Sequence, residues 1–399
     1  MTTIVAVAGA VLLVAVLLLL VPATVFFAQV VAAGHQAPAR EAGQRRPTVA
    51  VLMPAHDEAA GIAVALRALA PQLAAGDRLL VVADNCSDDT AAVAAACGAE
   101  VAVRIDPVRR GKGYALDHGL RYLDASSREV VVIVDADCIV AAGAIDLLAR
   151  ACAHAQRPIQ ARYLMYAPPG ASLRQRMAKF AWVVRNDVRP SGWQRLGGPC
   201  QLMGTGMALP WPMIAKVSLA SASIVEDMQL GLDFAAGGAA PRFCPEALVS
   251  STFPQTPEGT LAQRTRWEHG HLGMIAGKGA PLLWRGIARG QGELVAMALD
   301  LCVPPLAVLV LSLTALALVA ALMAAAGATI WPLGIAMVAL ALTIIATGLA
   351  WRRSGRSILS WSELLYAPAY ALAKVPIYIR LFTARQLHWI RTKRDGSEG

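Results

Sequence analysis

The stretch Val130-Val131-Val132-Ile133-Val134-Asp135-Ala136-Asp137 decides the fold class of this chain. Its run of β-branched residues is typical of a short strand that is buried on both faces of a sheet. Two carboxylates follow, and in an extended chain residues i and i+2 point to the same side. Paired carboxylate oxygens suit a hard divalent cation, Mg²⁺ or Mn²⁺, which often shares them with substrate phosphates. The stretch predicts a buried strand with a metal site at its end, although Asp-x-Asp alone is equally typical of a solvated turn.

Short apolar runs alternate with helical stretches on the amino-terminal side of this strand. The expected strands are Thr48–Met53, Leu79–Ala83 and Val101–Val103, and the expected helices lie near Glu58–Leu73, Asp88–Cys97 and Gly113–Leu123. This alternation predicts an α/β domain with a parallel sheet. Ligands of such sheets bind beyond the carboxyl ends of the strands, so the polar residues after each strand are the candidate site residues.

Charged residues make up only 16% of the chain, against roughly 25% in an ordinary soluble domain, and two long windows contain none. The window 1–39 contains an apolar run, Ile4–Val31, that is long enough to cross a membrane once as a helix. A cleaved signal peptide is the alternative, but the window starts without a basic residue and its apolar run is too long. The window 301–351 has room for two crossings joined at Gly327-Ala328-Thr329. The sequence predicts an integral membrane protein.

The net charge of +9 lies mainly at the two ends of the chain. Residues 1–50 contribute +2 and residues 351–399 contribute +6, whereas residues 51–350 contribute only +1. A nucleic-acid-binding protein would concentrate basic residues on its folded domain, so this distribution argues against that class. Basic residues beside apolar windows are instead typical of cytoplasmic membrane anchors.

Two groups of arginines predict the orientation in the membrane. Arg40, Arg45 and Arg46 follow the first window, and Arg352, Arg353 and Arg356 follow the second. Because basic flanks stay in the cytoplasm, the N-terminus is expected outside and the middle domain inside. The expected localisation is the bacterial inner membrane, as a multi-pass protein with a cytoplasmic catalytic domain.

The last apolar stretch, Trp361–Phe382, is broken by Pro368 and Pro376 and carries Lys374 and Arg380. It is therefore expected to be interfacial or re-entrant rather than spanning. The expected organisation is a transmembrane helix (1–33), a basic linker (34–47), a catalytic domain (48–275), an interfacial segment (276–293), two transmembrane helices (294–351) and a basic interfacial or re-entrant segment with a cytoplasmic tail (352–399).

Two polar segments lie between the first strands. Asp84 ends the second strand, where its carboxylate could accept hydrogen bonds from a base or ribose, and Asp88 resembles the N-cap of the next helix. Arg109-Arg110-Gly111-Lys112-Gly113 places three cations beside glycines that let the backbone approach a diphosphate. This segment is not a Walker A loop, because neither Ser nor Thr follows Lys112.

Two further motifs lie later in the chain. Glu226-Asp227 opens an amphipathic stretch, and a helix N-terminus there would favour ionised carboxylates. Such a carboxylate could be a general base, or the pair could simply cap the helix. Gln263-Arg264-Thr265-Arg266-Trp267 supplies a cation for phosphate and an indole that could stack on a sugar; an ordinary basic helix near the membrane is the alternative.

Four motifs therefore occur in a fixed order: Asp84, Asp135-Ala136-Asp137, Glu226-Asp227 and Gln263-Arg264-Thr265-Arg266-Trp267. Together they resemble the motifs of the family 2 glycosyltransferases, in particular the membrane-bound branch related to cellulose, chitin and hyaluronan synthases. The resemblance covers about residues 48–270. It implies an α/β catalytic domain of the GT-A (Rossmann-like) fold with flanking transmembrane helices.

The resemblance also implies a role for each motif residue. Asp84 would contact the uracil, and Asp135 would contact the nucleotide diphosphate. Asp137 and Asp135 would together bind a Mg²⁺ or Mn²⁺ ion. Asp227 would be the general base. The remaining substrate-binding residues are Glu226, Gln263, Lys112, Arg266 and Trp267. Lys112 and Arg266 would stabilise the diphosphate, and Trp267 would hold the acceptor.

The predicted function is inverting transfer of a sugar from a nucleotide sugar, a UDP-hexose or UDP-N-acetylhexosamine, to a saccharide or polysaccharide acceptor. Such a transfer needs a base for the acceptor hydroxyl and a cation for the leaving diphosphate, but no protein nucleophile. The alternatives are a single addition to a lipid-linked acceptor and a non-catalytic polysaccharide export or scaffold subunit. We also expect the protein to contact membrane lipid and to associate with either a second copy of the chain or an export partner. Nucleic acid is not an expected partner.

Overall fold

The computed structural model describes residues 2–34, 45–123, 128–168, 170–221, 225–254 and 256–383. Most of the predicted linker 34–47 and the end of the predicted tail lie outside these residues. The chain divides into two compact units. The helical unit comprises Met1–Gly34, Pro169–Gly197 and Glu268–Arg385, and the sheet unit comprises His35–Pro168, Gly198–Trp267 and Gln386–Gly399.

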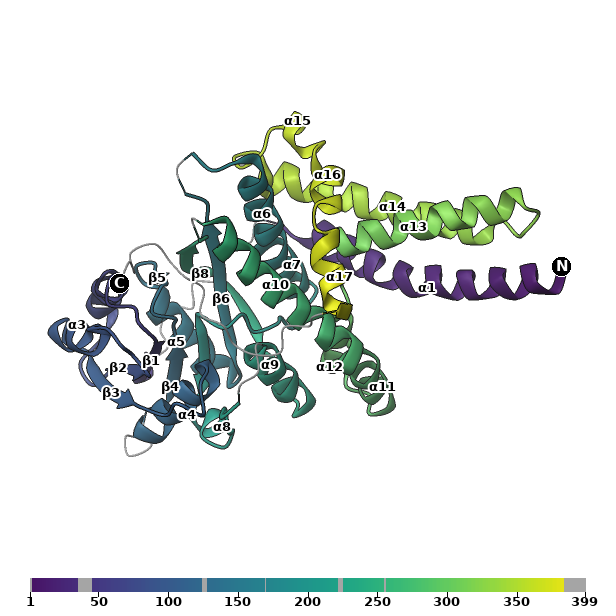
Figure 1. Cartoon of the computed structure of the whole chain (residues 1–399). Helices are drawn as coiled ribbons and strands as arrows, with labels where there is room; N and C mark the ends of the chain where they lie inside the picture. The colour runs from purple at the N-terminus through teal and green to yellow at the C-terminus, as the bar shows by residue number, and fades with distance from the viewer. Residues whose placement is uncertain are drawn as a thin grey trace. The chain divides into compact units, whose positions relative to one another are not determined.

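Among the described residues, the sheet unit contains one eight-stranded sheet of order β3-β2-β1-β4-β7-β6-β8-β5 (Figure 1). The strands are β1 (Val49–Ala55), β2 (Arg78–Asp84), β3 (Glu100–Arg104), β4 (Val130–Ile133), β5 (Ile139–Val140), β6 (Ile159–Tyr166), β7 (Met207–Pro210) and β8 (Arg242–Thr252). Strands β3, β2, β1 and β4 are parallel, which agrees with the strand and helix pattern of the sequence. The predicted α/β class is confirmed.

Helices connect and cover the strands of the sheet unit. They are α2 (Ile62–Leu69) with the 3-10 turn Ala70–Gln72, α3 (Thr90–Ala96), α4 (Lys112–Leu123), α5 (Ala144–Ala155), α8 (Trp211–Ile214), α9 (Glu226–Ala236) and α10 (Pro257–Met274), which ends in the helical unit. Gly119 of α4 faces Leu52 and Val82, where a Cβ atom would collide with their side chains. This close approach buries the apolar face of α4 against the sheet and fixes the helix start, Lys112, at the sheet edge.

The second half of the sheet is mixed, which the sequence pattern did not predict. Strand β7 is antiparallel to both β4 and β6, β6 is parallel to β8, and β5 is antiparallel to β8. Ile133 of β4 is paired with Met207 of β7. Antiparallel pairing therefore places the loop before β7 at the carboxyl end of β4, beside Asp135.

The helical unit contains, among the described residues, three helices that are long and apolar enough to cross a membrane. They are α1 (Thr2–Ala32), α13 (Leu306–Ala325) and α14 (Trp331–Ala350), and they lie side by side in Figure 1. Shared apolar contacts hold them together, including Val16 with Ala317 and Ala336. Gly327, at a φ of +87°, forms the turn between α13 and α14.

Shorter helices make up the rest of the helical unit. They are α6 (Leu173–Val183), α7 (Arg189–Arg195), α11 (Ala280–Ala288), α12 (Gly292–Leu301), α15 (Trp361–Leu364), α16 (Ala367–Leu372) and α17 (Val375–Thr383), with π-helical turns at Val184–Val188, Ile275–Gly279 and Trp351–Gly355. The stretch Trp361–Phe382 thus forms three short helices, each well below the roughly 20 residues that a crossing requires.

A buried ion pair fixes the end of α1 within the helical unit. Arg189 of α7 pairs with Asp300 of α12 at 2.8 Å. Gln29 of α1 donates to Asp300 Oδ1 at 2.6 Å and accepts from Arg189 Nε at 2.8 Å. All three side chains are buried, so each charge and amide depends on the others for its hydrogen bonds.

Two arginines also bind the last carbonyl groups of α1. Arg353 donates to the carbonyls of Val30 and Val31, and Arg195 donates to Ala32 O at 3.3 Å. Carbonyl groups in the last turn of a helix lack partners within the helix, and cations there interact favourably with the helix dipole. Arg353, which the sequence indicated as a membrane anchor, therefore also caps α1.

Substitution of Asp300 tests the buried ion pair. Asp300→Ala leaves the Arg189 guanidinium buried without its counter-ion, and we expect the free energy of unfolding to fall by about 3–5 kcal/mol. Thermal unfolding in detergent measures the loss. The double variant Arg189→Met with Asp300→Leu removes both charges and is expected to recover most of the stability. An unchanged melting temperature in Asp300→Ala contradicts this account.

Candidate functional site

Acidic residues at the ends of two strands lie at one edge of the sheet. Strands β1, β2 and β4 end at this edge because they are parallel, and β7 begins there because it is antiparallel to β4. Asp84 ends β2, and Asp135 and Asp137 follow β4. The topology therefore brings together residues that are far apart in the sequence.

Asp135 and Asp137 lie in a turn, which Cys138 N closes by donating to Asp135 O at 3.0 Å. This turn replaces the extended geometry expected from the spacing, because β4 already ends at Ile133. Ligand atoms of Asp135, Asp137 and Cys138 nevertheless all lie within 4.8 Å of one another. Asp135 Oδ1 is buried and accepts no aligned hydrogen bond from the described residues. Convergent carboxylate oxygens of this kind could hold a divalent cation.

The thiol of Cys138 differs from these carboxylates. Burial raises the pKa of Cys138 well above its ordinary value, and the charges of Asp137 and Asp135 raise it further. The thiol of Cys138 donates to Asp137 Oδ1 at 3.4 Å. The two carboxylates supply oxygen donors, which suit Mg²⁺ or Mn²⁺.

Lys112, the first residue of α4, joins the turn after β4 to the loop before β7. Its Nζ pairs with Asp135 Oδ1 at 2.5 Å and donates to Gly204 O at 2.7 Å. Burial alone would lower the pKa of Lys112, but the charges of Asp135, Glu226 and Asp227 outweigh it and raise the pKa above its ordinary value. Lys112 is thus a permanent positive charge among carboxylates.

The glycines beside Lys112 have a packing role that the sequence did not indicate. A Cβ atom on Gly113 would collide with the backbone carbonyls of Leu219 and Ser221. Gly111 has a φ of +131°, a conformation that residues with a Cβ atom rarely adopt. These glycines let the start of α4 pack against the 219–221 segment and so position Lys112.

Glu226 and Asp227 are the first two residues of α9. Burial raises the pKa of Glu226 to about 7, and the charge of Asp227 adds to this effect. Burial likewise raises the pKa of Asp135, with Lys112 opposing and the neighbouring carboxylates reinforcing the shift. Neighbouring carboxylates thus contribute to both raised pKa values, which indicates a negative potential that a bound cation would offset.

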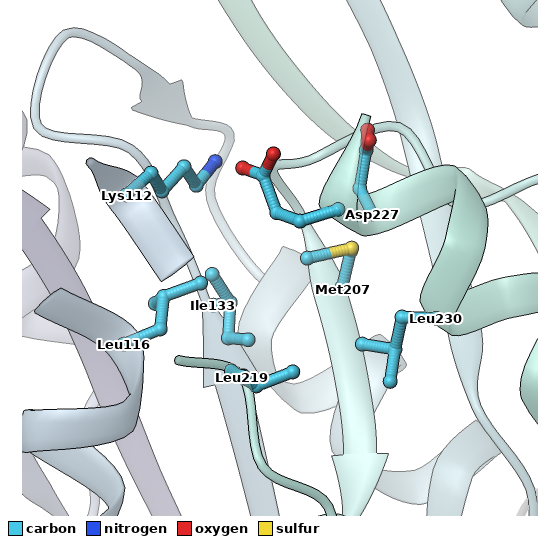
Figure 2. A pocket seen from close by; sticks show the side chains of 8 residues that line it. Lys112, Leu116, Ile133, Met207, Leu219, Asp227 and Leu230 are labelled. Carbon is cyan, nitrogen blue, oxygen red and sulfur yellow. The ribbon is translucent and has the colours of Figure 1, made fainter. Parts of the chain in front are cut away.

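A small pocket lies beneath these charges. Its lining comprises Lys112, Leu116, Ile133, Met207, Leu219, Glu226, Asp227 and Leu230. Figure 2 shows Lys112 and Asp227 at one end and the aliphatic side chains of Leu116, Leu219 and Leu230 at the other. Apolar walls of this kind lower the local dielectric constant and strengthen the electrostatic interactions of the charged end.

Gln160 of β6 supports the site, and sequence reasoning missed it. Its buried amide donates to Thr205 O at 2.9 Å and accepts from Met203 N at 2.8 Å. Thr205 Oγ1 in turn accepts from Asp135 N at 3.1 Å. Gln160 therefore holds the loop that contacts both Lys112 and Asp135. An amide within the apolar start of β6 is the signal that could have revealed it.

Asp84 lies at the same sheet edge but in a separate group. Its buried carboxylate accepts from Arg104 Nη1 at 2.6 Å and from Asn85 Nδ2 at 3.0 Å. Arg104 Nη2 also donates to Arg109 O at 2.8 Å. Asp84 therefore anchors the segment between β3 and α4, which precedes Lys112.

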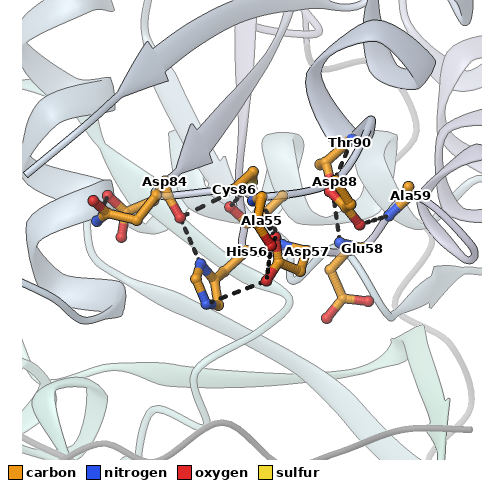
Figure 3. A network of polar contacts seen from close by, with 11 residues as sticks. Ala55, His56, Asp57, Glu58, Ala59, Asp84, Cys86, Asp88 and Thr90 are labelled. Atoms are coloured by element: carbon orange, nitrogen blue, oxygen red, sulfur yellow. Dashed lines mark hydrogen bonds and ion pairs between the residues drawn. The ribbon is translucent and has the colours of Figure 1, made fainter. Parts of the chain in front are cut away.

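The segment after β1 is braced against the segment after β2 (Figure 3). His56 Nδ1 lies 2.7 Å from Asp84 O, and Asp57 Oδ1 accepts from Ser87 N at 2.6 Å. Asp88 accepts from the backbone amides of Ala59 and Thr90, both at 3.0 Å. Helix α2 begins only at Ile62, later than predicted. The predicted N-cap role of Asp88 is wrong, because Asp89 is the N-cap residue of α3 and Asp88 instead binds the backbone on both sides of this junction.

Gln263, Arg266 and Trp267 lie on α10, outside the pocket of Figure 2. Gln263 is buried, whereas Arg266 and Trp267 are partly exposed. The structure thus gathers Lys112, Asp135, Asp137, Glu226 and Asp227 into one group, places Asp84 in a neighbouring group, and leaves the α10 residues on their own helix.

Comparisons with known proteins agree on one kind of enzyme. A sequence family described as "Glycosyltransferase like family 2" matches residues 47–270. Glucosyl-3-phosphoglycerate synthases of Mycobacterium tuberculosis and Mycolicibacterium paratuberculosis are 39% identical to this chain over 106 residues, which are 25% of this chain and 32% and 31% of those proteins. The match therefore spans about a third of their length.

One solved structure is similar over almost the whole chain. It is described as mannosyltransferase PcManGT from Pyrobaculum calidifontis in complex with GDP-Man and Mn²⁺. The TM-score is 0.53 at 16% identity, and the alignment covers 94% of this chain and 100% of that one. At this identity the likeness shows the fold, which is the predicted GT-A, Rossmann-like arrangement of a mixed α/β sheet.

Gly204 provides a test of the packing around the charged group. It has a φ of +86°, and an added Cβ would lie 3.2 Å from Asp227 Oδ2 and 3.4 Å from Lys112 Nζ. Gly238 also has a φ of +86° but has open space around it. Both alanine variants incur the left-handed strain of about 1–2 kcal/mol, and Gly204→Ala is expected to lose about 1–3 kcal/mol more through overpacking. Equal losses in the free energy of unfolding would show that the site tolerates the methyl group.

The raised pKa of Glu226 predicts a pH dependence of stability. Between its ordinary pKa of 4.5 and about 7, the folded protein retains a proton that the unfolded chain releases. The stabilisation from this group is therefore complete below pH 4.5 and is lost as the pH rises through 7. Glu226→Gln is expected to flatten this decline in thermal unfolding with EDTA. The exposed Asp89→Asn is the control, and identical pH profiles of Glu226→Gln and the unsubstituted protein contradict the assignment.

Proposed function

Because this chain belongs to the family 2 glycosyltransferases, we propose that it is a membrane-bound, inverting enzyme that transfers a sugar from a nucleotide sugar to a saccharide acceptor. The observation that carries the proposal is the group of four carboxylates around the ammonium of Lys112 at the carboxyl edge of the sheet. Such a group combines a base, a cation site and a phosphate-binding charge. The closer relationship to the cellulose, chitin and hyaluronan synthase branch is part of this proposal.

Asp135 and Asp137 would hold a Mg²⁺ or Mn²⁺ ion. The fit rests on the convergence of the two carboxylates and on the buried Asp135 Oδ1, whose partner among the described residues is the Lys112 ammonium at 2.5 Å. The Pyrobaculum mannosyltransferase, described as a complex with Mn²⁺, supports this choice. A bound cation would supply electrostatic stabilisation of the leaving diphosphate.

Asp227 would act as the general base. Its place in the first turn of α9 favours the ionised carboxylate, because the positive end of the helix dipole lies there. Asp227 would take the proton of the acceptor hydroxyl as that oxygen attacks the anomeric carbon. The bond from that carbon to the diphosphate breaks in the same step, and its electron pair leaves with the diphosphate. The single displacement inverts the configuration.

The remaining predicted residues would bind the donor and the acceptor. Lys112 and Arg266 would offset the charge that develops on the diphosphate, and Trp267 would hold the apolar face of the acceptor sugar. The uracil contact is assigned to Asp84, with Glu226 and Gln263 supporting the substrates. The nucleotide sugar is a UDP-hexose or a UDP-N-acetylhexosamine in this proposal.

A single addition to a lipid-linked acceptor is the second candidate function. It is favoured by the three apolar helices, since a bundle of three offers little room for a conduit that would export a growing polymer. In either version α1, α13 and α14 would cross the bacterial inner membrane and leave the sheet unit in the cytoplasm. Export of a polymer would instead require a second copy of the chain or a partner protein.

Membrane lipid is a further proposed partner. Helix α11 presents exposed Trp284 and Ile287, and this region was predicted to be interfacial.

A non-catalytic scaffold role is disfavoured because all the core acids are present.

Asp227→Asn tests the proposed base. In detergent with Mn²⁺ and a panel of UDP-sugars, we expect UDP release to fall about 10²–10⁴-fold, because the acceptor hydroxyl loses its base. Asp233→Asn, on the exposed side of the same helix, is the matched control and should retain activity. Undiminished turnover in Asp227→Asn would remove Asp227 as the base. If the unsubstituted protein turns over no donor with any acceptor, the scaffold role gains support.

A further inference from the structure

We propose that Lys112 is a displaceable counter-ion of the metal site. In the free protein its ammonium pairs with Asp135, and it moves onto the nucleotide diphosphate when the cation and the nucleotide bind together. The inference rests on the proposed function, because it concerns the donor and the metal of the same site. It adds an order of binding, in which the cation binds weakly alone and tightly with the nucleotide.

The geometry places Lys112 on the atom that a metal would need. Its Nζ lies 2.5 Å from Asp135 Oδ1, which is the buried oxygen without an aligned hydrogen bond. The side chains of Lys112 and Asp135 are 21% and 31% exposed. The pair is therefore more exposed than the ion pair of Arg104 and Asp84, whose side chains are 10% and 8% exposed.

The charges indicate the direction of the exchange. A divalent cation between Asp135 and Asp137 would lie close to the Lys112 ammonium, where partial burial leaves their repulsion only weakly screened. Lys112 therefore opposes binding of the cation alone. A diphosphate offers the ammonium new anionic partners, and Lys112 can then leave Asp135 without losing its charge compensation. Because such coupling is reciprocal, the cation strengthens nucleotide binding by the same factor.

The backbone of Lys112 is held in place, so the movement is limited to the length of its side chain. Lys112 begins α4, and Gly113 packs so closely on the 219–221 backbone that the helix start cannot shift far. The flexible side chain of Lys112 therefore makes the movement while its backbone stays in place. Its second bond, to Gly204 O at 2.7 Å, keeps the ammonium beside the site in the free protein.

Metal binding without turnover tests the proposal. Mn²⁺ is titrated into the full-length protein in detergent, with and without UDP, and free Mn²⁺ is measured by electron paramagnetic resonance. Lys112→Met is expected to bind Mn²⁺ alone about tenfold more tightly than the unsubstituted protein, because the opposing charge is gone. The same variant should bind UDP more weakly in the presence of Mn²⁺, because the diphosphate loses a cation.

Three variants control the measurement. Lys112→Gln is a second neutral variant and should behave like Lys112→Met. Lys112→Arg keeps the charge and should bind Mn²⁺ as the unsubstituted protein does. Lys216→Met removes the charge of an exposed lysine in the same unit and should leave Mn²⁺ affinity unchanged.

Two results would overturn the inference in different ways. If the neutral variants bind Mn²⁺ alone with equal or lower affinity, Lys112 does not obstruct the metal site, and the proposed enzyme function stands without it. If no protein binds Mn²⁺ even with UDP, the metal site of the proposed function is wrong, and the inference falls with it.

Discussion

Crowding of like charge is the constraint on which the sheet unit depends. Asp135, Asp137, Glu226 and Asp227 gather around the single ammonium of Lys112, and carboxylates this close repel one another unless charge or helix dipoles offset them. The structure supplies these offsets from separate elements: the start of α4 brings the ammonium, and the start of α9 brings the dipole. The surplus negative charge that remains makes the site receptive to a cation.

The parallel half of the sheet could be predicted because its information is local. Each of its strands is a short apolar run followed by a helix, so the stretch 130–137 and its neighbours revealed both the fold class and the edge where the acids lie. The mixed half carries no such signal. Strand β7 has only four residues, and its partners β4 and β6 are distant in sequence, so its position depends on tertiary packing.

The candidate site was predictable to the same extent. The acidic motifs can be recognised by residue type and spacing, but the residues that hold them in place cannot. Arg104 lies within a strand and gave no hint that it pairs with Asp84, and Gln160 gave no hint that it holds the loop at Thr205. Gly113 was noticed as a neighbour of Lys112, but its packing against the 219–221 backbone was not predicted, because that segment is distant in sequence.

The end of α1 has a consequence for how the protein is made. Its last carbonyl groups and the amide of Gln29 find partners on Arg189, Arg195, Asp300 and Arg353. The ribosome synthesises these partners 160 to 323 residues after the groups they bind. Helix α1 therefore gains these partners only after much later segments have been synthesised, and a nascent chain that stops before Arg353 lacks the donor to the carbonyls of Val30 and Val31.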